Sequence, residues 1–161
     1  MSTVSRDRLV GHAVEIPVRF AECDSYGVVW HGHYALYLER VREDLTGRFG
    51  FTATSAMALG YRVPITRMEI RYRRAIRADT TIVARARLRP PEVARLVLDY
   101  DIRDAADDLL ASAETEQVVL AASGELLLTL PGDLKRLVEN ILKYQNEMAG
   151  TREARLGMRR S

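Results

Sequence analysis

The sequence is poor in the residues that bind metals or form disulfides. It holds one cysteine, Cys23, and three histidines among 161 residues, which excludes an internal disulfide and any multi-cysteine metal site. His31 and His33 lie two residues apart at a predicted helix start and so point in different directions, whereas zinc needs three or four converging ligands. We therefore expect no metal site, and the single cysteine suits a reducing cytoplasm.

Long apolar runs and a strong charge of one sign are also absent. No segment approaches the roughly 18 apolar residues of a membrane-spanning helix, and the N-terminus lacks a secretory signal. A net charge of +2 indicates no nucleic-acid partner. The composition, 47% hydrophobic, is typical of a globular protein. We expect a single domain over residues 1–150 and a basic, disordered tail over residues 151–161.

Several familiar catalytic motifs are missing. The chain has no Gly-x-Ser-x-Gly elbow, no Gly-x-x-x-x-Gly-Lys phosphate loop and no Gly-x-Gly-x-x-Gly after a strand. These absences argue against a serine hydrolase of the elbow type, a P-loop enzyme and a dinucleotide-binding enzyme. No motif surrounds Cys23, which we interpret as a small apolar filler rather than a nucleophile.

The sequence does contain apolar residues at regular spacings, and the spacing changes along the chain. Residues 14–20 alternate as a strand at a sheet edge or one that starts late. From about His31 the spacing changes to three and four, which predicts a largely buried helix ended by Gly47 and Gly50; its apolar face is Tyr34, Tyr37, Leu38, Val41 and Leu45. Alternation then predicts four long strands at 61–72, 80–88, 94–102 and 109–122, with a bulge near Thr66. The run 126–130 continues the last strand or adds another, and Pro131 opens a second helix. The order predicts an α+β fold, a sheet curled around one buried helix.

The candidate for chemistry is Asp24, a carboxylate in a turn just before the buried helix. On spacing alone it is as well explained as a turn or capping residue that hydrogen-bonds local backbone. The residues after it favour a catalytic role: Gly27 permits an unusual backbone shape, Val28, Val29 and Trp30 form an apolar wall, and the helix starts near His31. Unpaired N–H groups there can hold an oxyanion while the acid attacks or activates water. These are the parts that hydrolysis of a thioester needs.

These same residues carry a resemblance. The runs Val18-Arg-Phe-Ala-Glu-Cys-Asp24, Gly27-Val-Val-Trp-His31, and Tyr34 with Tyr37-Leu-Glu-Arg-Val-Arg42 resemble the 4-hydroxybenzoyl-CoA thioesterase family. They are especially similar to the acyl-CoA thioesterases of the tol-pal cluster. The match is tightest over residues 16–45 and continues by element order to Pro131. One departure is His33, where these relatives commonly have Asn.

The resemblance implies a hotdog fold, with an antiparallel sheet wrapped around one long buried helix plus a C-terminal helix. It also implies a homo-oligomer, a dimer or tetramer, with each active site between two subunits. Asp24 would be the catalytic base or nucleophile, and the backbone N–H of His31 would bind the thioester oxygen. The other implied substrate-binding residues are Tyr26, Gly27, Trp30, Tyr34 and the Arg62-Val63-Pro64 region.

We therefore expect a thioesterase that acts on acyl-CoA or acyl-carrier protein, with no cofactor besides the coenzyme A or phosphopantetheine of its substrate. Two sets of arginines are candidates for binding the phosphates: Arg71, Arg73 and Arg74, and Arg85, Arg87 and Arg89. Glu39 is a candidate second acid, although an ion pair with a neighbouring Arg explains it better. The alternatives are a non-catalytic acyl-thioester-binding domain and a thioesterase for a polyketide-type carrier-protein substrate. A hotdog dehydratase is disfavoured, because the chain lacks its His–acid pairing.

Overall fold

The computed structural model describes residues 8–158, with side chains to residue 152. In chain order the elements are β1 (His12–Pro17), η1 (Phe20–Glu22), α1 (His33–Gly47), α2 (Ala53–Ala58), β2 (Tyr61–Arg62), β3 (Ile65–Tyr72), β4 (Thr81–Leu88), β5 (Arg95–Arg103), β6 (Leu109–Val118), β7 (Leu120–Ala121) and α3 (Gly132–Met158). Five strands form an antiparallel sheet in the order β1-β4-β5-β6-β3, and β2 pairs with β7. The edges of the large sheet are therefore β1 and β3.

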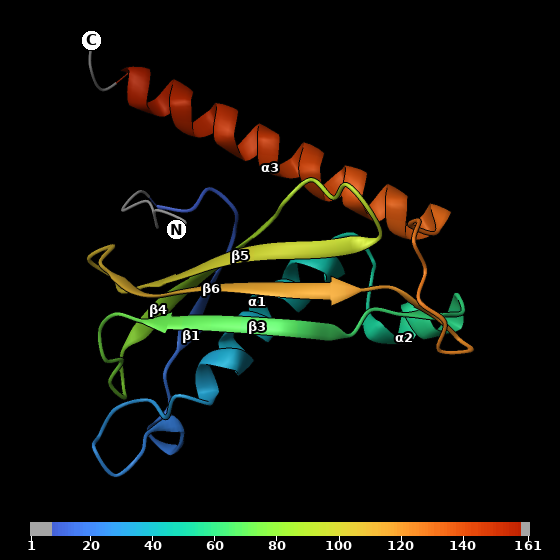
Figure 1. Cartoon of the computed structure of the whole chain (residues 1–161). Helices are drawn as coiled ribbons and strands as arrows, with labels where there is room; N and C mark the ends of the chain where they lie inside the picture. Colours follow the sequence, from blue (N-terminus) through green and yellow to red (C-terminus); the bar gives the residue numbers. More distant parts are fainter. Residues whose placement is uncertain (1–7, 159–161) are drawn as a thin grey trace.

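The sheet curls around α1, which lies behind β3 and β6 (Figure 1). The face of α1 expected to be apolar is the face that is buried: Tyr34, Tyr37, Leu38, Val41 and Leu45. It packs mainly on β4 and β1. On β4 the inward positions Ala84 and Ala86 are small and fully buried, which lets the helix approach the sheet closely. This arrangement is the hotdog fold, as expected.

The strand predictions are confirmed in outline and corrected in detail. The register of β3 against β6 shifts between Ile65 and Arg67, which is the bulge expected near Thr66. The expected strand 61–72 is two strands, because residues 61–62 leave the large sheet to pair with β7. Helix α2 was not expected; a capping box fixes its start, in which Thr52 and Ser55 exchange hydrogen bonds. The run 126–130 forms only an isolated bridge, between Leu126 and Leu120.

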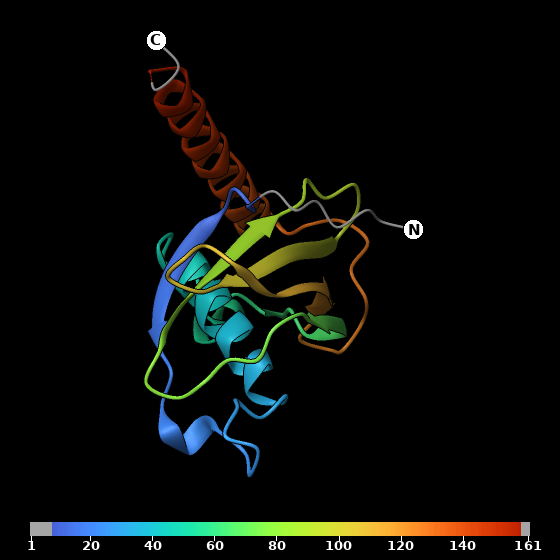
Figure 2. The ribbon, with the colours of Figure 1, turned by 90° about the vertical axis from the view of Figure 1, so that its left-hand side faces the viewer.

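Helix α3 lies across the end of the sheet and extends past the body of the domain (Figure 2). Its first half buries Leu134, Leu137, Val138 and Ile141. The tail expected to be disordered from Thr151 is helical as far as Met158, and residues 159–161 lie outside the described residues. The expected domain boundary at residue 150 stays a prediction.

The polar side chain of Gln145 helps to hold α3 to the sheet. Gln145 is 5% exposed, accepts a hydrogen bond from the Leu88 N–H at 2.8 Å and donates one to the Leu88 carbonyl at 3.0 Å. Gln145→Met keeps the volume but leaves two buried backbone groups unpaired, so we expect a loss of about 2–4 kcal/mol in the free energy of unfolding. Chemical denaturation measures this loss. Asn146→Met at the exposed neighbouring position is the control, and an equal loss in both variants would contradict this role.

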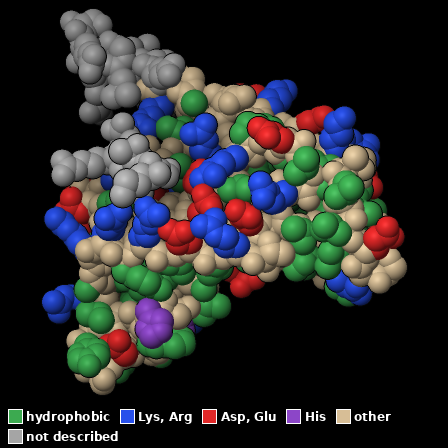
Figure 3. Space-filling model, in the orientation of Figure 1, with side chains coloured by type: hydrophobic (Ala, Val, Ile, Leu, Met, Phe, Trp, Pro, Cys, Tyr) green, Lys and Arg blue, Asp and Glu red, His purple; other side chains and the backbone are tan. Residues whose placement is uncertain are grey.

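The outer face of the sheet is covered by ion pairs. Arg67 contacts Glu69, Glu114 and Glu116, and Arg89 contacts Asp99 and Glu114. Red and blue side chains form a band across this face in Figure 3, with apolar side chains below it. The two surfaces of the sheet therefore differ: the inner face is the core and the outer face is suited to water.

Candidate active site

Asp24 lies in the loop between β1 and α1. Its position fits both roles that the sequence allows, a turn residue and a catalytic carboxylate. Its Oδ1 accepts a hydrogen bond from the Tyr26 N–H at 2.8 Å, as a turn residue would. Its backbone N–H donates to the Val28 carbonyl at 2.9 Å. Gly27 closes the turn with a φ of 73°, a conformation that favours glycine. Across residues 8–158, Oδ2 of Asp24 takes part in no hydrogen bond, so one oxygen is held while the other stays available.

The helix N-terminus lies at the end of the same loop. Gly32 is the N-cap of α1 and makes no side-chain cap, and the His33 N–H donates to the Trp30 carbonyl at 2.9 Å. Within the described part of the chain, the N–H groups of His31 and Gly32 make no hydrogen bond. Unpaired N–H groups at the positive end of a helix dipole form a site suited to an oxyanion.

Aromatic side chains surround this helix start. A Cβ on Gly32 would lie 2.1 Å from the Trp30 indole, so glycine is what allows the ring to cover the helix end. Tyr34 is buried and meets Tyr72 edge-to-face, with 4.8 Å between ring centroids. The Tyr72 hydroxyl donates to the His31 carbonyl at 3.1 Å. Strand β3 therefore fixes the position of the residue expected to bind the thioester oxygen.

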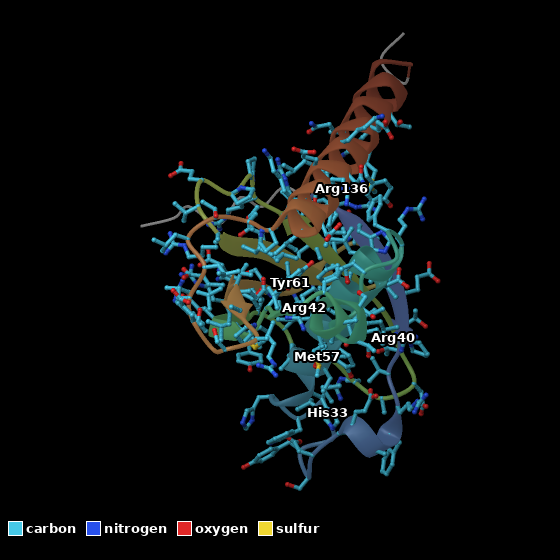
Figure 4. The ribbon with its side chains drawn as sticks, turned by 90° about the vertical axis from the view of Figure 1, so that its right-hand side faces the viewer. His33, Arg40, Arg42, Met57, Tyr61 and Arg136 are labelled. Carbon is cyan, nitrogen blue, oxygen red and sulfur yellow. The ribbon has the colours of Figure 1, made fainter. Side chains whose placement is uncertain are left out.

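Three expected pocket residues do not join this cluster within one chain. Val63 and Pro64 precede β3, whereas Tyr72, which contacts His31, ends it. The eight residue steps from Pro64 to Tyr72, the end of β3, separate the two groups by about 26 Å at the usual rise of a strand. In Figure 4 Tyr61, next to this segment, lies far above His33, with Met57 between them. Tyr26 is exposed at the tip of the loop.

The candidate phosphate-binding arginines are mostly engaged elsewhere. Arg85 is buried against Asp101, and Arg89 pairs with Asp99. Arg71 pairs with Glu69 and Arg74 with Asp108. Of the two expected sets, Arg73 and Arg87 are exposed and form no ion pair with any described residue, and Arg73 directly follows Tyr72 at the site.

Two other acidic residues near α1 have structural partners. Glu39 lies 3.2 Å from Arg42 one turn along α1, which is the ion pair that the sequence favoured over a catalytic role. Glu22 was not singled out by the sequence, although it stands two positions before Asp24. Its carboxylate accepts a hydrogen bond from the buried Tyr37 hydroxyl at 2.7 Å. Only the fold brings these two residues together.

Two further observations concern ligands and membranes. No three His, Cys, Asp or Glu side chains of the described residues converge as metal ligands. None of the helices over residues 8–158 is both long and apolar enough to cross a membrane.

A sheet curled around a buried helix, with a carboxylate loop leading into the helix N-terminus, defines a hotdog-fold enzyme. The residue pattern of the Thioesterase-like superfamily matches residues 18–138, and the chain belongs to that superfamily. The chain is therefore an enzyme of the thioesterase class. The narrower resemblance to 4-hydroxybenzoyl-CoA and tol-pal thioesterases stays a prediction, as does the cytoplasmic location.

The names of individual relatives agree with this family assignment. The chain is 27% identical over 104 residues to a Bacillus subtilis protein assigned by name as an acyl-CoA thioesterase, covering 65% of this chain and 75% of the relative. It is 28% identical over 91 residues to a chloroplastic acyl-acyl carrier protein thioesterase of Arabidopsis thaliana, covering 56% and 48%. The solved DHNA-CoA thioesterase of Staphylococcus aureus superposes with a TM-score of 0.74 at 23% identity, covering 84% and 93%. At 23% identity, the similarity to the Staphylococcus aureus structure shows a shared fold alone.

Proposed function

We propose that the chain hydrolyses acyl thioesters with Asp24 as base or nucleophile and the N–H groups of His31 and Gly32 as oxyanion hole. The observation that carries this proposal is their placement on one loop. Asp24 is held by one carboxylate oxygen, which leaves Oδ2 available, and the α1 N-terminus begins eight residues later with unpaired N–H groups. Such donors contribute about a hundred- to a thousandfold each to acyl transfer.

The proposed reaction needs no cofactor beyond the thiol carrier of the substrate. The thioester oxygen would accept hydrogen bonds from the two N–H groups, which stabilises the charge of a tetrahedral intermediate. Either Asp24 takes a proton from water as the water attacks the carbonyl carbon, or Asp24 itself attacks and the anhydride is then hydrolysed. Both routes break the C–S bond and release the free acid and the thiol.

A second copy of the chain would complete the acyl pocket, and the edge strand β3 is where we place it. An edge strand with unpaired backbone and apolar side chains is rarely left open. Ile65, Met68 and Tyr72 of β3 are partly exposed apolar residues, and Met57 and Trp30 are exposed apolar residues outside the strand. Apolar side chains gather below the charged band in Figure 3. The charged outer face stays in water in such a dimer.

Antiparallel pairing of two β3 strands explains why the expected pocket residues are far apart in one chain. A two-fold axis at the middle of β3 places the beginning of one strand beside the end of the other. Val63 and Pro64 of the partner would then lie next to Trp30 and Tyr34, which supports an active site shared by two subunits. The aromatic and apolar lining would take the acyl group.

The acyl carrier is open between coenzyme A and a carrier protein, because relatives of both names resemble the chain. A thiol-release assay over acyl-CoA and acyl-carrier-protein substrates with short, medium, aromatic and polyketide-type acyl groups tests the proposal. We expect catalytic release with kcat/KM at or above about 10⁴ M⁻¹s⁻¹, the usual lower range for enzymes, on at least one substrate. Saturable binding without thiol release would instead favour the non-catalytic acyl-binding alternative.

A further inference from the structure

The loop that carries Asp24 is tied to α1 by a single buried hydroxyl. Tyr37 lies one turn into α1, and its side chain is 3% exposed. Its hydroxyl donates a 2.7 Å hydrogen bond to Oε2 of Glu22, which also accepts the N–H of Arg19 at 3.0 Å. The Glu22 carboxylate therefore joins the start of the loop to the buried side of α1, one turn from the start of the helix.

The backbone of Glu22 holds the other end of the same loop. Its carbonyl accepts the Trp30 N–H at 2.9 Å, immediately before His31. Asp24 follows Glu22 by two residues and is bonded across the loop to Val28. A displacement of Glu22 would thus move the carboxylate and the N–H groups of the helix start relative to each other.

We propose that the Glu22–Tyr37 hydrogen bond positions Asp24 and the His31 N–H for catalysis, with Glu22 and Tyr37 acting through the loop rather than on the substrate. This inference rests on the proposed function. Both residues are absent from the set that the sequence singled out for the site. Misplacement of catalytic groups by about 1 Å costs on the order of a hundredfold in rate, so a bond of this kind has a measurable effect on kcat.

The protonation states suit the hydrogen bond. Partial burial acts to raise the pKa of Glu22, but the hydrogen bonds from Tyr37 and Arg19, with the nearby His33 and Arg19 side chains, outweigh it and hold that pKa below its ordinary value. Burial and the Glu22 carboxylate raise the pKa of Tyr37. At neutral pH an ionised acceptor therefore faces a neutral donor, which is the stronger kind of hydrogen bond.

Tyr37→Phe removes the hydroxyl and keeps the buried ring. We expect kcat to fall about ten- to a hundredfold with KM changed by less than about twofold, because geometry rather than binding is disturbed. Tyr100→Phe is the matched control: Tyr100 is also 3% exposed, and its hydroxyl lies 3.0 Å from the Thr115 hydroxyl. It should lose comparable stability and keep its kcat. Equal kcat values in the two variants would overturn the proposal.

A second measurement does not depend on thioester hydrolysis. Trp30 is the chain's single tryptophan, so its fluorescence reports on the loop that Glu22 holds. Acrylamide quenching of Trp30 should rise in Tyr37→Phe and stay at the wild-type level in Tyr100→Phe. Unchanged quenching in Tyr37→Phe would refute the positioning role, even if the chain proved not to be a thioesterase. Increased quenching in Tyr37→Phe, together with a wild type inactive on every thioester, would refute the proposed function alone.

A conservative pair covers the case in which Tyr37→Phe does not fold. Glu22→Gln retains an oxygen that accepts from Tyr37, whereas Glu22→Leu retains none. We expect Glu22→Gln to keep more of the wild-type kcat than Glu22→Leu, with quenching of Trp30 ordered in the same way. Equal kcat values for the two variants, or values equal to the wild type, would show that the carboxylate does not position the site.

Discussion

Asp24→Asn is expected to lower kcat by about a hundred- to ten-thousandfold, the usual contribution of a general base. Asn keeps an oxygen that can accept the Tyr26 N–H, now 2.8 Å from Oδ1, so the turn should persist. What the change removes is the negative charge and the proton-accepting ability of Oδ2. A thiol-release assay under saturating substrate measures kcat, and circular dichroism with thermal unfolding checks that the fold is retained.

The control for Asp24→Asn is Glu92→Gln, which removes one exposed carboxylate from the turn between β4 and β5. It should leave kcat within about twofold, since surface changes away from a site are usually neutral. Activity at the wild-type level in Asp24→Asn would eliminate Asp24 as base or nucleophile. The superfamily membership would stand in that case, and another acid would have to be sought.

The helix and the site loop could be predicted from the sequence because both are local features. The three- and four-residue spacing of Tyr34, Leu38, Val41 and Leu45 has one explanation in a globular protein, a helix buried on that face. Asp24, Gly27 and Trp30 lie within seven residues, so their order along the chain already places them on one loop. The bulge near Thr66 was visible for the same reason: a one-residue slip reverses which side chains face inward.

What the sequence did not reveal depends on contacts between distant residues. Glu22 and Tyr37 are fifteen positions apart, and nothing in their spacing indicates that a hydroxyl and a carboxylate meet. Arg85 was a candidate for binding phosphate by its sequence, and only the fold pairs it with Asp101 in a buried ion pair. The disordered tail was expected because residues 151–161 lack apolar periodicity, yet α3 continues as far as Met158. A helix anchored by its first half can extend beyond its predicted end.

Met68→Asp is expected to separate the proposed dimer and abolish most activity at low protein concentration. Met68 lies near the middle of β3, so antiparallel pairing about a two-fold axis at this residue puts Met68 beside its symmetry mate. Two like charges facing each other across the axis cost several kcal/mol, enough to raise the dimer dissociation constant at least about a hundredfold. Analytical ultracentrifugation measures this constant. Leu128→Asp is the control and should leave the assembly unchanged, because Leu128 is exposed and its carbonyl accepts the Ala94 N–H beside β5, which β6 separates from β3.

Mixing two inactive variants then tests whether the site is shared. Asp24→Asn removes the carboxylate, and Pro64→Arg places a cation in the segment that the partner would contribute to the acyl pocket. If each site takes Asp24 from one subunit and Pro64 from the other, a heterodimer carries one intact site. Statistical exchange of subunits would restore about a quarter of the wild-type sites. If each site is built within one chain, the mixture has only the summed activity of its components. Recovery above that sum is the expected result, because within one chain β3 holds Pro64 about 26 Å from Tyr72, which contacts His31 at the site.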